Sequence, residues 1–63
     1  MFIKTEHGNY LNSKYIKYMC VAEHTNKYGI KAEIGHNAYK ISRHETFEEA
    51  QEALDRLVKD LNS

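Results

Sequence analysis

The segment from Thr46 to Leu61, TFEEAQEALDRLVKDL, restricts the fold of this chain more than any other stretch. Its apolar residues recur every three or four positions, the spacing that places side chains on one face of an α-helix. Thr46 and Glu49 stand at the spacing of a capping box, in which each side chain accepts a hydrogen bond from the other's backbone N–H. We therefore predict a helix over residues 46–62 that packs on the rest of the chain. Its core face has six members: Phe47, Ala50, Leu54, Leu57, Val58 and Leu61.

The residues before this helix predict β-strands. Residues 30–34 alternate apolar and charged side chains, which is the period-two pattern of a half-buried strand. Four other segments without a breaker residue are separated by short turn-type clusters: 2–6, 10–12, 15–24 and 38–43. Short connections favour antiparallel neighbours. The prediction is an α+β fold, an antiparallel β-meander of four to five short strands over residues 2–43, packed on one face by a single C-terminal α-helix in one domain spanning residues 1–63.

Size and composition limit what such a domain can do. A chain of 63 residues has a small core, and its single cysteine, Cys20, cannot form an internal disulfide. Nine Lys and Arg residues balance nine Asp and Glu residues, so the chain as a whole has no field that would attract nucleic acid or an anionic membrane. The longest apolar run, residues 18–22, is too short to span a bilayer, and the N-terminal residues do not form a signal peptide. We expect a cytoplasmic protein.

The segment 15–24, YIKYMCVAEH, raises the question of what covers its second face. Ile16, Tyr18, Cys20 and Ala22 alternate with another apolar set, and a single helix covers only one face of a sheet. The apolar residues on the face that the helix does not cover have four possible fates: burial in a symmetric dimer, reorientation by a β-bulge, exposure to solvent, or burial against a different protein. We predict a homodimer, with an interaction surface formed by Tyr15, Lys17, Met19 and Val21.

Catalytic, cofactor and metal sites have little support in the sequence. The chain contains no nucleophile-elbow motif and no glycine-rich phosphate loop, and a protomer of this size cannot easily enclose a substrate pocket. In a simple meander His7, His24 and His44 would lie at one end of the sheet, but without close spacing they are expected to be solvated rather than bound to zinc. We predict no enzyme activity, no cofactor and no metal site.

Nucleic-acid binding is the alternative function. Basic and aromatic residues alternate in residues 14–18, 27–28 and 39–40. In such a composition the aromatic rings can stack on nucleobases while the lysines contact phosphates. The neutral charge of the whole chain disfavours this function.

Several stretches together resemble small bacterial and phage accessory proteins that have a β-meander followed by one helix. The stretches are Gly8-Asn9-Tyr10-Leu11-Asn12, then Ile16 and Met19, then Tyr39-Lys40-Ile41 and Thr46-Phe47-Glu48-Glu49-Ala50. Their spacing is similar to that of FlbD-type proteins of flagellar operons and, locally, to LytTR DNA-binding modules. The resemblance transfers no functional residue. It implies a small, cytoplasmic, non-enzymatic regulatory or inhibitory module that binds a larger partner.

Overall fold

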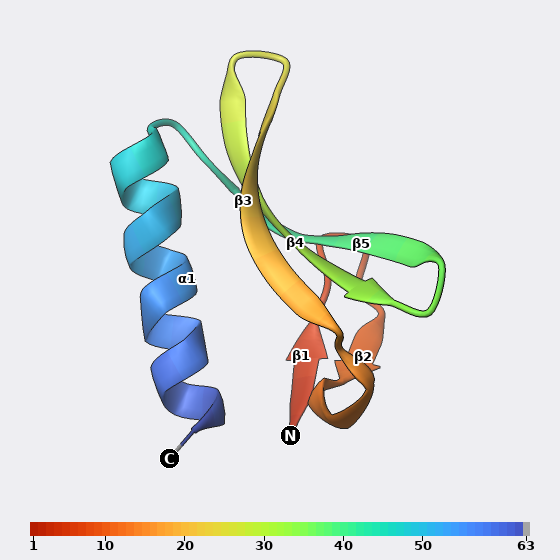
Figure 1. The fold of residues 1–63 in the computed structure, drawn as a ribbon. Helices are drawn as coiled ribbons and strands as arrows, with labels where there is room; N and C mark the ends of the chain where they lie inside the picture. The colour runs from red at the N-terminus through yellow and green to blue at the C-terminus, as the bar shows by residue number, and fades with distance from the viewer. Residues whose placement is uncertain (63) are drawn as a thin grey trace.

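The computed structural model describes residues 1–62 and confirms the α+β class, with a C-terminal helix packed on antiparallel strands (Figure 1). The elements are β1 (Phe2–Lys4), β2 (Tyr10–Asn12), a 3₁₀ helix (Ser13–Tyr15), β3 (Tyr18–His24), β4 (Lys27–Ile34), β5 (Asn37–His44) and α1 (Phe47–Leu61). The strands form two sheets rather than one continuous meander. β1 pairs with β2, and the second sheet has the order β3-β4-β5.

The 3₁₀ helix separates the two sheets, and it explains why the predicted strand over residues 15–24 begins only at Tyr18. The side-chain Oδ1 of Asn12 accepts a hydrogen bond of 3.1 Å from the Lys14 N–H, which caps this turn. The Ile16 N–H then donates to the Ser13 carbonyl at 3.2 Å. These local bonds turn the chain out of the first sheet before it enters the second.

Both hairpins of the larger sheet have loops of two residues. Thr25 and Asn26 connect β3 to β4 with φ values of 48° and 63°, as in a type I′ turn. Gly35 begins the next loop with φ 61°. Because these loops are so short, β4 and β5 extend further than the predicted strands did. The turn predicted to run as far as Gly29 ends at Asn26.

A bulge interrupts the pairing of β5 with β4. Ile30 lies opposite Ser42, but the next residue, Lys31, lies opposite Lys40, so Ile41 is an extra residue without a partner. Such a bulge bends the strand and increases the local twist. The β3-β4 and β4-β5 hairpins accordingly extend in different directions (Figure 1).

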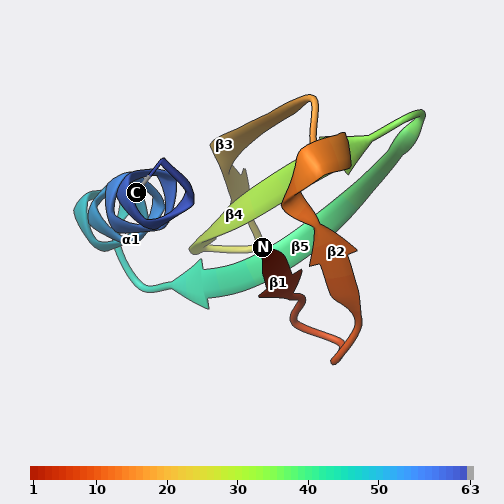
Figure 2. The ribbon, with the colours of Figure 1, turned by 90° about the horizontal axis from the view of Figure 1, so that it is seen from below.

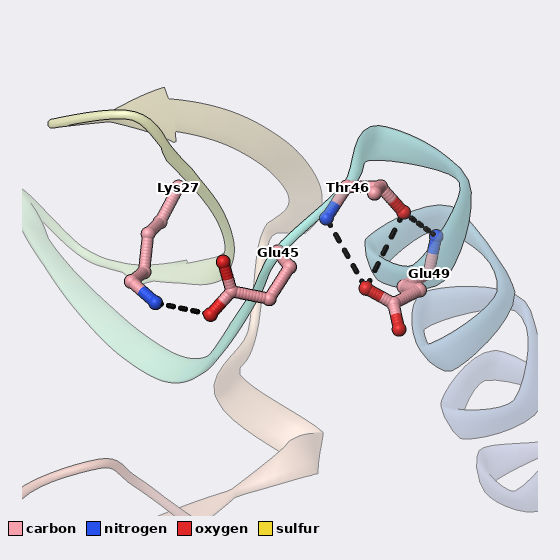
Figure 3. Close-up of polar contacts among 4 residues, drawn as sticks. All are labelled: Lys27, Glu45, Thr46 and Glu49. Atoms are coloured by element: carbon pink, nitrogen blue, oxygen red, sulfur yellow. Dashed lines mark hydrogen bonds and ion pairs between the residues drawn. The ribbon is translucent and has the colours of Figure 1, made fainter.

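The start of α1 has the predicted capping box (Figure 3). The Glu49 N–H donates to Thr46 Oγ1 at 3.1 Å, and the Thr46 N–H donates to Glu49 Oε1 at 3.2 Å. Just before the cap, Glu45 forms an ion pair with Lys27, and this lysine lowers the pKa of the Glu45 carboxyl. The helix start is therefore fixed both to its own backbone and to the hairpin between β3 and β4.

The core lies between the larger sheet on one side and both α1 and the β1-β2 hairpin on the other. Its apolar members are Ile3, Leu11, Ile30, Ala32, Ala50 and Leu54. On the predicted core face of α1, Leu57 and Leu61 are half-buried, whereas Phe47 and Val58 keep 48% and 39% of their surface exposed. Within residues 1–62, no helix is both long enough and apolar enough to cross a membrane.

Candidate interaction surface

The pairing register assigns each residue of the β3-β4-β5 sheet to one of its two faces. Directly opposed residues share a face, so Val21 belongs with Ile30, and Met19 belongs with Ala32 and Tyr39. Ile30 and Ala32 are only 2% and 0% exposed. We call this side the inner face.

Helix α1 covers the inner face. The Phe47 ring at the start of α1 packs edge-on against the Tyr28 ring, with 6.0 Å between the ring centroids. Tyr28 lies two residues before Ile30 on β4 and therefore on the same inner face. The Tyr28 hydroxyl is also hydrogen-bonded to Glu23, which raises the pKa of the tyrosine. The helix thus lies on the side that contains Met19 and Val21.

This arrangement corrects the face assignment made from the sequence. Tyr15 lies in the 3₁₀ helix and is 60% exposed, so it is not on the strand at all. Lys17 is exposed, and its Nζ donates to the Gly35 carbonyl at 3.0 Å. Met19 and Val21 are partly buried on the inner face. The four residues therefore do not form one uncovered surface.

The side of the sheet without a helix, the outer face, comprises the alternate residues of each strand. They are Tyr18, Cys20, Ala22 and His24 on β3, Lys27, Gly29, Lys31 and Glu33 on β4, and Ala38, Lys40 and Arg43 on β5. Ala38, Lys40 and Arg43 are exposed. The β1-β2 hairpin leaves these three residues exposed, and its own apolar residues, Ile3 and Leu11, are buried.

A hollow of about 170 Å³ lies on the outer face and is lined by residues of β3, β4 and β5. Ala22, Gly29 and Ala38 contribute small side chains or none. The charged lining residues are Lys31, Lys40 and Arg43 together with one acidic residue, Glu23. A larger residue at Gly29 would crowd the sheet, because a Cβ there would lie 3.2 Å from the Ser42 carbonyl oxygen. The result is a depression with small apolar residues in which cationic residues outnumber acidic ones.

Two of these cations have an unusual arrangement. Lys31 and Lys40 are directly opposed across β4 and β5, and the side chain of neither forms a hydrogen bond or ion pair with the described residues. Arg43, in contrast, is 2.6 Å from Glu6 Oε1. Like charges directly opposed on a sheet are destabilising by a few tenths of a kcal/mol up to about 1 kcal/mol. This like-charge pair therefore lowers the stability of the sheet on its outer face.

Charge is also unevenly divided along the chain. Residues 1–44 contain seven Lys and Arg against three Glu, and residues 45–63 contain two against six Asp and Glu. Residues 1–44 therefore have a net charge of +4 and residues 45–63 have −4, although the sum is zero. The neutrality of the whole chain concealed a basic N-terminal part, and counting charge separately for the predicted strand region and the predicted helix would have revealed it.

Tyr18 borders the outer face beyond the hollow. Its hydroxyl donates to Glu33 Oε2 at 2.6 Å, and the pKa of Tyr18 is raised because ionisation would break this bond and oppose the carboxylate. The side chain remains 48% exposed. A fixed, accessible aromatic ring of this kind is typical of residues that anchor protein interfaces.

His24 and His44 end β3 and β5 at the same end of the larger sheet but belong to opposite faces, and His7 lies in the turn between β1 and β2. The His44 Nε2 lies 2.9 Å from the Ser42 hydroxyl, on the inner face beside α1. Among residues 1–62, no three His, Cys, Asp or Glu side chains are placed to hold a metal ion.

Comparison of the chain with models of protein families, with characterised proteins and with solved structures gives no match.

Proposed function

We propose that this chain is a non-enzymatic binding module whose outer face receives an acidic surface of a larger protein. The observation that carries the proposal is the directly opposed pair Lys31 and Lys40, which has no counterion within residues 1–62 and borders an apolar hollow. A regulatory or inhibitory role in the cytoplasm is part of the proposal. The single cysteine, which gives the chain no disulfide of its own, supports that compartment.

Electrostatics favours a carboxylate as the group that binds between the two lysines. Two ammonium groups about 6 Å apart repel by roughly 0.7 kcal/mol in water, and more where the protein surface lowers the effective dielectric constant. A carboxylate placed between them turns this repulsion into two attractive contacts. A partner with an Asp or Glu at this position would therefore gain affinity from both lysines.

The size of the hollow favours a side chain of a protein over a small-molecule ligand. Its volume of about 170 Å³ is below the range of about 300–1,000 Å³ that is typical of small-molecule sites. Ala22 and Ala38 give it apolar walls that suit one apolar side chain. An acidic residue beside an apolar one on the partner would match both features.

The experiment is a titration of the ¹⁵N-labelled chain with short poly-L-glutamate, followed by NMR. We expect the largest shifts at Ala22, Lys31 and Lys40. The double variant Lys31→Gln/Lys40→Gln should lose about tenfold in affinity, the equivalent of about 1.4 kcal/mol. Lys4→Gln/Lys14→Gln, which removes the same charge from two exposed lysines away from the hollow, is the matched control. Equal losses in both variants would show non-specific attraction and sink the proposal.

Single-stranded nucleic acid is a second candidate. Its support is the net charge of +4 on residues 1–44 together with the Lys14 ammonium, which lies 5.8 Å from the ring centroid of Tyr15. By strand register, however, the outer face has one aromatic residue for base stacking, Tyr18, beside Tyr39 in the lining of the hollow. Fluorescence anisotropy with oligo-dT at low salt tests this candidate. Tight binding that is lost on changing Lys14, Lys17 or Lys40, with no response to poly-L-glutamate, would favour it over the protein partner.

A further inference from the structure

The two edges of the β3-β4-β5 sheet differ in how they are protected. At the β5 edge, the Glu6 N–H donates to the Lys40 carbonyl at 2.9 Å, and the bulge at Ile41 interrupts the strand. Charged side chains, bulges and partial cover are the devices by which proteins prevent strand edges from pairing with other chains. The β5 edge has all three, because Lys40 and Arg43 also lie on it.

Of these devices the β3 edge has only one charged side chain, Glu23 near its C-terminal end. Within residues 1–62, β4 is the only strand that pairs with β3, so β3 forms the edge of the sheet. Figure 2 shows no strand beside that edge. It pairs with β4 over seven consecutive residues without a bulge, and residues 18–22 carry no charge, proline or glycine. A long, regular edge with a single charged residue is a template for an additional strand.

The hairpin turn determines which backbone groups of β3 are available. The two residues that flank a two-residue loop form backbone hydrogen bonds with each other, so the backbone groups of His24 bond to those of Lys27. The backbone groups of every second residue before His24 also form hydrogen bonds with β4. The N–H and C=O groups of Met19, Val21 and Glu23 therefore point away from the sheet. Three residues spaced in this way can form a complete antiparallel ladder with another strand.

We propose that two copies of this chain pair through β3, antiparallel and centred on Val21, to form a six-stranded sheet. This register uses the whole strand. It opposes Val21 to its own copy, Met19 to Glu23 and Tyr18 to His24 of the second copy, so that no like charges are directly opposed. The contact is isologous and closed, as in most homodimers.

Charge favours this arrangement over stacking of the two outer faces. Face-to-face stacking would bring both copies of Lys31 and Lys40 together. Edge pairing instead leaves the two Lys31 residues three strand spacings apart, about 14 Å, which exceeds the Debye length of about 8 Å at physiological salt. Both hollows then lie on the same side of one sheet.

The dimer rests on the β3 edge alone, and it stands or falls independently of the acidic partner. If that partner exists, the paired hollows would bind two of its acidic segments at once and raise its avidity.

Solution mass by light scattering, from about 10 µM to about 1 mM protein, tests the dimer. We expect the mass to rise from 7.4 kDa toward twice that value. Ala22→Lys, which adds a charge to the β3 edge, should weaken association at least tenfold, whereas Ala38→Lys, the same change on the same face at β5, should leave it unchanged. A mass that stays at 7.4 kDa up to the highest concentration overturns the dimer. Equal weakening by the two variants does so as well, because it would place the contact on the outer face.

Val21→Pro is a second test that does not depend on a new charge. Proline is tolerated on an edge strand where the N–H faces away from the sheet, so the variant should fold, as checked by circular dichroism, and remain a monomer. Hydrogen exchange of the unmodified chain gives a readout that no folding defect can imitate. The Met19, Val21 and Glu23 amides should exchange at least tenfold more slowly at high protein concentration than at low. Concentration-independent exchange at these three amides would refute β3 pairing.

Discussion

Replacing Lys31 with glutamate should make this protein more stable while weakening its binding of an acidic partner. Lys31 faces Lys40 directly across β4 and β5, on the exposed outer face. The substitution removes a like-charge pair and creates an opposite-charge pair, each change contributing about 0.2–1 kcal/mol. We expect the free energy of unfolding to rise by about 0.5–1.5 kcal/mol in total, with the nearby Glu33 on the same face keeping the gain toward the lower end.

Urea denaturation at low salt measures this gain. With a slope of about 1 kcal/mol per molar urea for a small domain, the midpoint should rise by about 0.5–1.5 M. Lys40→Glu should give a similar increase. The double variant Lys31→Glu/Lys40→Glu restores a like-charge pair and should return to nearly the original midpoint. About 1 M sodium chloride should suppress all of these differences, because the side chains are accessible to ions.

Lys4→Glu is the matched control. Lys4 is exposed, lies opposite the uncharged Tyr10 in the smaller sheet, and undergoes the same change in charge. Its midpoint should move by less than half as much. If Lys31→Glu and Lys40→Glu remain folded but are no more stable than the original chain at low salt, the opposed lysines impose no cost, and the reasoning that assigns them to an anionic partner fails.

Four further perturbations test the fold. Leu54→Ala should lower the free energy of unfolding by about 3 kcal/mol, since Leu54 is 8% exposed between helix and sheet; thermal and urea melts measure this. Thr46→Ala removes the capping box and should cost about 1 kcal/mol in the same assays. Thr25→Asn should stabilise the protein by about 0.5–1 kcal/mol, because a β-branched residue at φ 48° is strained where asparagine is tolerated. The raised pKa of Tyr18 means that its bond to Glu33 stabilises the protein fully below the unfolded-state value of 10.0 and that this stability is lost as pH rises through the higher folded-state value. Glu33→Gln should bring the Tyr18 titration, followed by absorbance and assigned by comparison with Tyr18→Phe, back toward 10.0.

The helix could be predicted from the sequence because its signals are local. The apolar spacing and the Thr46–Glu49 pair both lie within one segment, and the observed helix begins and ends within one residue of the predicted limits. The split into two sheets was not predicted, although Asn12 two residues before Lys14 is the side-chain cap that starts the 3₁₀ helix. The bulge at Ile41 leaves no local signal, because it depends on how β5 matches the twist of its neighbour.

The wrong face assignment has one cause, the length of a turn. Both faces of the segment 15–24 are apolar, so alternation alone cannot decide which face is covered. Reading the next turn as far as Gly29 left the register of β3 against β4 undefined. A two-residue turn at Thr25–Asn26 opposes Val21 to Ile30, and Ile30 is one of the apolar residues in the alternating segment 30–34. The open side of the sheet follows from that single correction.

The separation of charge between strands and helix has a physical logic of its own. Acidic residues at the start of α1 are favoured by the helix dipole and by the capping box, so the helical segment collects negative charge for reasons unrelated to binding. No comparable rule requires two lysines to oppose each other on a sheet, and sheet stability disfavours it. The negative charge of the helix therefore needs no explanation beyond folding, whereas the Lys31–Lys40 pair does. This asymmetry is the physical reason to search for a partner at the outer face of the sheet rather than along the exposed side of the helix.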